Sequence, residues 1–205
     1  MDDFRRIFPK IEPLFFLVVF GSVFPILGFL VGWWGSIPLL AEEHIKYGAL
    51  GGLLVGILID ILFLKRWIIR AYQMNLAWLI LIYLFYSVGL FGFFMGVPVF
   101  NALLGLFAGF YMGLRMAEEK KSKAEAEGVF RKTGYFTALV LAIACIAALW
   151  IASMDGSLAA NINGMFALKN PLSNSTILLL SGIGGMGLAV LEFYITRGMA
   201  RRAYR

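Results

Sequence analysis

Long apolar runs separated by short charged segments dominate the pattern of this chain. A helix needs about 20 apolar residues to cross a hydrocarbon core roughly 30 Å thick, because each residue adds about 1.5 Å of rise. A turn at Pro98 divides the long uncharged stretch between Arg70 and Arg115. The pattern then predicts six transmembrane helices, over residues 14–34, 47–64, 76–96, 99–114, 135–154 and 176–196. The fourth run is short, so residues 76–114 also fit a re-entrant pair.

Composition narrows the class of protein. Hydrophobic residues make up 61% of the 205 residues, and charged residues make up only 15%. Ordinary globular domains are about 45–50% apolar and about 25% charged. One water-soluble core could not hide so much apolar surface, so the sequence predicts an all-α, polytopic membrane bundle with residues 1–205 as a single transmembrane domain.

The positions of the basic residues predict the orientation. Sixteen of the 18 lysines and arginines lie in segments that the six-helix layout places on one side, and only Lys46 and Lys169 fall on the other. Loops on the cytoplasmic side carry the excess of lysine and arginine. We therefore expect both termini in the cytoplasm and the chain in the cell membrane, as a multi-pass protein of a prokaryotic plasma membrane.

Polar residues inside the expected helices are the candidates for a transport pathway. Asp60 and Glu192 are the acidic residues well inside these helices, and buried carboxylates in a membrane are costly and often functional. They could bind a cation, carry a proton, or pair with a basic residue at the cytoplasmic interface. Asn101 is a further polar candidate. Pro25 is expected to kink the first helix and expose a carbonyl near Gly21 or Ser22.

Small residues recur every four positions in the even-numbered helices. This spacing leaves a flat stripe along a helix, which lets another backbone approach closely. Tight helix packing is one interpretation, and a surface that lines a pathway or slides during transport is the other. The glycines of these stripes are Gly48, Gly52, Gly56, Gly105, Gly109, Gly113 and Gly185.

The last residues carry a basic tail. Arg201 and Arg202 are expected to lie against anionic lipids of the inner leaflet, because clustered basic residues beside a membrane are attracted to acidic headgroups. The net charge of +6 does not predict nucleic-acid binding, since the position of basic residues carries more meaning than their sum in a membrane protein.

The residues that catalysis requires are scarce. Cys145 and His44 are the chain's only cysteine and histidine. The sequence contains no nucleophile–base set and no metal-ligand constellation, so we expect neither an enzyme nor a bound metal or cofactor.

Two functions remain. The first is a transport or channel-like protein for an ion or small solute. The second is a non-catalytic subunit of a larger membrane assembly, such as a solute-capturing subunit of a transporter complex. Size, six spans and inward termini are similar in format to the substrate-binding subunits of energy-coupling vitamin transporters, although no motif is shared. Either function is compatible with a homo-oligomer.

Overall fold

The computed structural model describes residues 2–167 and 170–204, with side chains from residue 12 onward. Over these residues the chain forms helices and turns, with no strand. Six helical segments are long and apolar enough to cross a membrane. They are Glu12–Ser36, Glu42–Ile69, Leu76–Phe93, Pro98–Glu118, Lys123–Met154 and Asn174–Ala203. The all-helical class and the six candidate spans predicted from the sequence are therefore confirmed.

The surfaces of these helices carry large apolar side chains. Ile61 and Leu62 on the second candidate span are 72% and 69% exposed, and many leucines, isoleucines and phenylalanines of the other spans are similarly open. Water-soluble proteins rarely expose contiguous apolar surface on this scale. The surface thus supports a multi-pass membrane protein.

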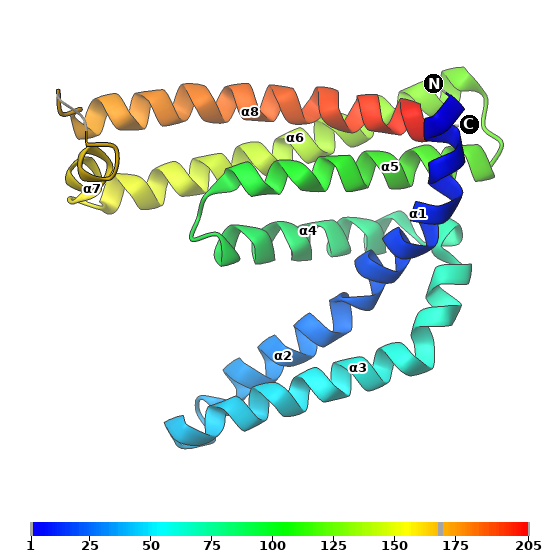
Figure 1. Cartoon of the computed structure of the whole chain (residues 1–205), viewed down its shortest axis with the longest axis horizontal. Coiled ribbons are helices and arrows are strands. Elements are labelled where there is room, and N and C mark those ends of the chain that lie inside the picture. Colours follow the sequence, from blue (N-terminus) through cyan, green and yellow to red (C-terminus); the bar gives the residue numbers. More distant parts are fainter. Residues whose placement is uncertain (1, 168–169, 205) are drawn as a thin grey trace. The chain divides into compact units, whose positions relative to one another are not determined.

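The chain forms two compact units, Met1–Trp78 and Leu79–Arg205, which we call unit 1 and unit 2. Unit 1 contains three α-helices joined by short turns (Figure 1). They are α1 (Asp2–Gly21), α2 (Val23–Ser36) and α3 (Ile45–Ile69). A 3-10 turn at Glu42–His44 precedes α3.

Glycine-to-glycine contacts hold α2 against α3. A Cβ built on Gly52 would lie 2.0 Å from the carbonyl oxygen of Gly28, and one on Gly48 would lie 3.0 Å from that of Gly32. The two helices therefore run antiparallel with their backbones in direct contact. Gly56 extends the same line, because its Cβ would meet the carbonyl oxygen of Phe24 at 2.2 Å.

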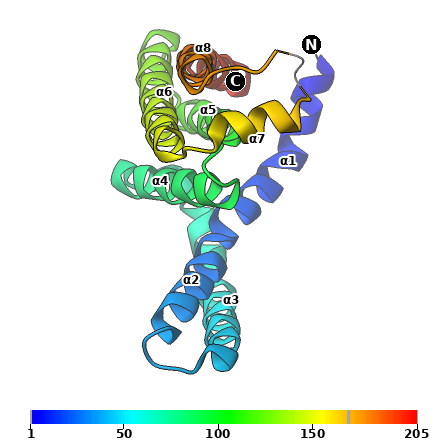
Figure 2. The same cartoon turned by 90° about the vertical axis from the view of Figure 1, so that its left-hand side faces the viewer.

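Unit 2 is built around three long helices that lie side by side in both views (Figures 1 and 2). They are α5 (Ala102–Glu118), α6 (Lys123–Met154) and α8 (Asn174–Ala203). The helix α4 (Leu76–Phe93) leads into the unit, and the short α7 (Leu158–Met165) lies between α6 and α8 in sequence.

A second glycine line joins α5 to α8. A Cβ on Gly109 would lie 2.2 Å from the carbonyl oxygen of Thr196, and one on Gly113 would lie 2.3 Å from that of Ala200. Both helices advance by four residues between these contacts, so α5 and α8 run parallel. The helix α6 runs antiparallel to α8, since Gly134 contacts Phe193 and Gly185 contacts Cys145.

Three segments differ in detail from the pattern of helices and loops expected from sequence. The helix α4 ends at Phe93, and Met95 and Gly96 have φ angles of 54° and 79°, so the turn precedes Pro98. A 3-10 turn, Pro98–Asn101, then leads into α5. The expected loop 155–174 contains the additional helix α7.

In the charged segment after α5, one helix ends at Glu118 and the next begins at Lys123. Lys120 has a φ angle of 52°, and Ser122 and Glu125 form a reciprocal capping box that begins α6. Ala126 and Phe130 then pack with Met116 and Ala200 in a buried cluster. These two residues are four apart and thus share a face of α6. The first turns of α6, which precede the expected span at residues 135–154, therefore already pack against α5 and α8.

Candidate functional site

Glu192 on α8 is the most deeply buried acidic side chain among those described, with 0% of its surface exposed. The hydroxyl of Tyr83 donates to its Oε1 across a long 3.4 Å. Its Oε2 is buried and accepts no hydrogen bond within the described part of the chain. Burial of a carboxylate is costly unless opposite charge or several donors compensate it. Besides this bond, the backbone N–H of Gly105 is the other donor to the carboxyl among the described residues, and an ionised carboxylate would need more.

Gly105 on α5 makes the room that this carboxyl occupies. A Cβ built on Gly105 would lie 2.3 Å from Oε1 and 2.5 Å from Cδ of Glu192. The hydroxyl oxygen of Thr196 lies 2.5 Å from the same point. Any larger residue at position 105 would displace the carboxyl, so the glycine line of α5 positions this site as well as the helix contact.

Two buried threonines lie beside Glu192. The hydroxyl of Thr137 on α6 donates to the carbonyl oxygen of Gly134 at 3.1 Å, and it lies 2.9 Å from the hydroxyl of Thr196. Either hydroxyl can be the donor in the threonine pair, because both rotate freely and each also carries acceptor lone pairs. The pair joins α6 to α8 beside the space that the carboxyl occupies.

Asn101 supplies another buried oxygen without a donor. Its amide nitrogen donates to the carbonyl oxygen and the hydroxyl of Ser87, at 2.8 and 2.9 Å, and this fixes which end of the amide carries the oxygen. The Oδ1 atom accepts no hydrogen bond from any described residue. Asn101 precedes Gly105 by four residues, about one helical turn. The start of α5 therefore presents a second acceptor one turn from the Glu192 contact.

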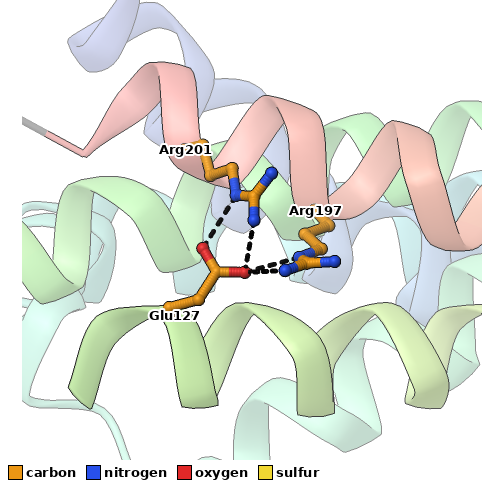
Figure 3. A network of polar contacts seen from close by, with 3 residues as sticks. All are labelled: Glu127, Arg197 and Arg201. Carbon is orange, nitrogen blue, oxygen red and sulfur yellow. Dashed lines mark hydrogen bonds and ion pairs between the residues drawn. The ribbon is translucent and has the colours of Figure 1, made fainter. Parts of the chain in front are cut away.

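The nearby arginines have other partners. Arg197 and Arg201 on α8 both donate to Glu127 on α6, as Figure 3 shows. Arg115 pairs with Glu119 at 2.8 Å along α5. Among the ion pairs of the described chain none includes Glu192. The ion pair considered for Glu192 at the interface is thus formed by Glu127 instead.

Asp60 and Pro25 lie in unit 1. The Asp60 side chain is 7% exposed, and its buried Oδ1 has no hydrogen-bond partner within the described residues. It lies beside the break between α1 and α2, because its Oδ2 is 4.0 Å from the point where a Cβ on Gly21 would be. Pro25 follows this break inside α2. Asp60 and Gly21 are thus neighbours in unit 1, and Pro25 lies in the first turn of α2 after the break.

Several residues of these sites escaped the sequence analysis. Gly28 and Gly32 oppose the predicted glycines of α3, and their four-residue spacing within the first span was an available signal. Thr137 and Thr196 gave no such signal, because threonine hydroxyls often bond to their own helix. Tyr83 is one of several aromatic residues in its span, and only the packing of α4 singles it out.

The described residues contain no group of three or more histidine, cysteine, aspartate or glutamate side chains that could hold a metal ion. Comparison of the chain with known proteins finds no match among family models, curated proteins or solved structures. Any proposal for the function therefore depends on the chemistry of the buried side chains themselves.

Proposed function

We propose that this chain is an integral membrane protein that transports an ion or small solute, with the Glu192 carboxyl as its proton- or cation-binding group. The supporting observation is a fully buried carboxyl, in a candidate span, with an oxygen that lacks a donor. Such a group needs a compensating positive charge, because an uncompensated buried ion costs several kcal/mol. A proton or small cation that binds and leaves supplies this charge, and that exchange is the elementary step of coupled transport.

The neighbours of Glu192 suit this role. Tyr83 orients one carboxyl oxygen, and the Thr196 hydroxyl lies beside the same glycine, Gly105. Asn101, four residues before Gly105, adds a buried neutral oxygen without a described donor. A neutralised Glu192 allows the helices to close around it, whereas its ionised form favours opening toward water. Gly105 faces the Glu192 and Thr196 side chains and Gly109 faces the α8 backbone, so no large side chains interlock at this contact and a small shift of α5 along α8 is permitted.

The orientation is part of the proposal. Both termini lie in the cytoplasm of a prokaryotic cell, and the plasma membrane surrounds the bundle. Introduced cysteines at Asn163 and Lys123, in a Cys145→Ser background, test this. An impermeant thiol reagent added to intact cells labels position 163 and spares position 123. Labelling at position 123 from outside overturns the orientation.

Flux measurements test the transport function. Purified wild type and Glu192→Gln are reconstituted in liposomes that contain a pH-sensitive dye, with imposed proton, Na⁺ and K⁺ gradients. We expect Glu192→Gln to fold and to lose at least nine-tenths of the wild-type flux, on the order of the tenfold change that about 1.4 kcal/mol produces. Glu118→Gln, at an exposed carboxyl on α5, is the matched control and keeps full flux. Equal flux in wild type and Glu192→Gln rejects the role of Glu192.

The second function, a subunit of a larger membrane assembly, is favoured by one observation. A Cβ built on Gly184 or Gly187 of α8 meets nothing within 4 Å, so these glycines leave an open, flat face on the helix. A helix of another protein, or of a second copy, could pack closely there. Co-purification of a stoichiometric foreign chain, lost in Gly184→Leu and Gly187→Leu, supports this function over the first.

A further inference from the structure

The break between α1 and α2 releases a backbone carbonyl. The amide of Ser22 bonds to the carbonyl oxygen of Val18 at 3.2 Å, and the amide of Ile26 bonds to that of Ser22 at 3.1 Å. Gly21 directly precedes Ser22, and the helical partner of its carbonyl oxygen would be the amide of residue 25. Residue 25 is proline, which has no N–H. The Gly21 oxygen thus lacks its normal helical donor.

The carboxyl of Asp60 lies beside this break. Its Oδ2 is 4.0 Å from the Cβ position of Gly21, and the absence of a side chain there keeps the approach open. The side chain is only 7% exposed, and its Oδ1 accepts no hydrogen bond from the described residues. A carboxyl with a formal charge and one unpartnered oxygen therefore lies beside the residue whose carbonyl lacks its helical donor.

Unit 1 offers no described positive group to this carboxyl. Lys65, Arg66 and Arg70 follow it on α3 and are exposed, and none of them forms an ion pair with Asp60 among the described side chains. Glu12, nearer the middle of α1, accepts the hydroxyl of Tyr72. The charge of an ionised Asp60 is consequently not balanced by any ion pair among the described side chains.

We propose that Asp60 and the Gly21 carbonyl form a binding site for a monovalent metal cation of the Na⁺ or K⁺ class. Carboxylate and carbonyl oxygens are the ligands that hard cations prefer, and carbonyls freed at helix breaks coordinate such ions in membrane proteins. A single carboxylate balances a single charge, whereas a divalent ion would leave a net positive charge in a low-dielectric surrounding. The site lies in unit 1 and stands independently of the role of Glu192.

Cation-dependent thermal stability tests the proposal. The full chain in detergent is unfolded in NaCl, KCl or choline chloride at equal ionic strength and constant pH. A bound ion stabilises the folded state by mass action, so the unfolding temperature rises with Na⁺ or K⁺ and saturates, while choline gives no rise. Asp60→Asn removes the charged ligand and abolishes the response. Pro25→Ala restores an N–H donor to the Gly21 carbonyl, so we expect at least a tenfold higher half-saturating cation concentration.

Two further variants test whether the cation response belongs to this site. Glu192→Gln keeps the response even where it loses flux, so failure of either proposal leaves the other standing. Gly51→Ala, on the same helix but with nothing within 4 Å of the added Cβ, also keeps it. An unfolding temperature that is the same in all three salts overturns the proposal. A response that follows pH alone does so too, because the occupant is then a proton. If Asp60→Asn fails to fold, an unchanged half-saturating concentration in Pro25→Ala overturns it.

Discussion

The hydroxyls of Thr137 and Thr196 lie 2.9 Å apart and join α6 to α8 where both side chains are completely buried. Each threonine is thereby held beside Glu192 by a partner on the opposite helix. The bond thus ties the residue one turn after Glu192 to the neighbouring helix, whichever hydroxyl donates.

We expect Thr196→Val to destabilise the protein, because Thr137 loses its hydrogen-bond partner on α8 while the shape of the side chain is kept. Interhelical hydrogen bonds in membrane proteins contribute about 0.6 kcal/mol on average and at most about 1.7 kcal/mol. Unfolding in detergent measures the change. Thr133→Val is the control, since that hydroxyl bonds only within its own helix, to Val129 at 3.0 Å. Equal losses in both variants contradict an interhelical role.

We expect Gly52→Ala to destabilise the α2–α3 contact by about 1–3 kcal/mol, the usual cost of overpacking. The added methyl would lie 2.0 Å from the backbone oxygen of Gly28, so a backbone must move. Gly51→Ala adds the same methyl where nothing lies within 4 Å, and alanine favours a helix by about 1 kcal/mol over glycine. Thermal unfolding of the pair should show opposite or clearly unequal shifts. Equal shifts would mean that position 52 faces lipid.

We expect Glu127→Gln to cost more stability than Arg201→Gln. One carboxylate serves two arginines, so its loss removes every ion pair of the cluster, whereas Arg197 keeps its partner when Arg201 is replaced. Arg201 is 52% exposed, so its pair contributes about 1 kcal/mol or less. Unfolding at low salt and in 1 M NaCl measures this, because salt screens exposed pairs. A loss of stability that is the same in both salts would contradict an ionic origin.

We expect Arg202→Gln to reduce retention of anionic lipid more than Arg201→Gln does. Arg201 donates two hydrogen bonds to Glu127, so part of its charge is already balanced, whereas Arg202 is exposed on the same turn. A basic residue near an anionic surface contributes about 1 kcal/mol of attraction. Flotation with liposomes that contain or lack an acidic phospholipid gives the comparison. Equal retention by both variants would show that the Glu127 pairing has no influence on lipid binding.

Much of the architecture is encoded in one-dimensional patterns. Apolar runs and the turn signals at Gly96 and Pro98 predict the candidate spans because both depend on local sequence. Helix ends are less well determined. The helix α6 begins at Lys123 because Ser122 and Glu125 cap it and because Phe130 finds a buried surface, and hydropathy registers neither cause.

The candidate sites are predictable only in part. Asp60 and Glu192 stand out in the sequence because each is an acidic residue inside an apolar run. The residues around Glu192 come partly from other helices, so Tyr83 and Thr137 cannot be inferred before the rotation and register of those helices are known. The same holds for Arg197, whose contact with Glu127 depends on the antiparallel packing of α6 and α8.

The parallel course of α5 and α8 has an electrostatic consequence. Each helix carries about half an elementary charge at either end, positive at its start and negative at its finish, and two parallel macrodipoles side by side repel one another. The antiparallel α6 packs against both and offsets part of this repulsion. The finishing ends of α5 and α8 also carry Arg115, Arg201 and Arg202 in their last turns. The arginines from which the orientation is inferred are thus also the counter-charges of two helix termini.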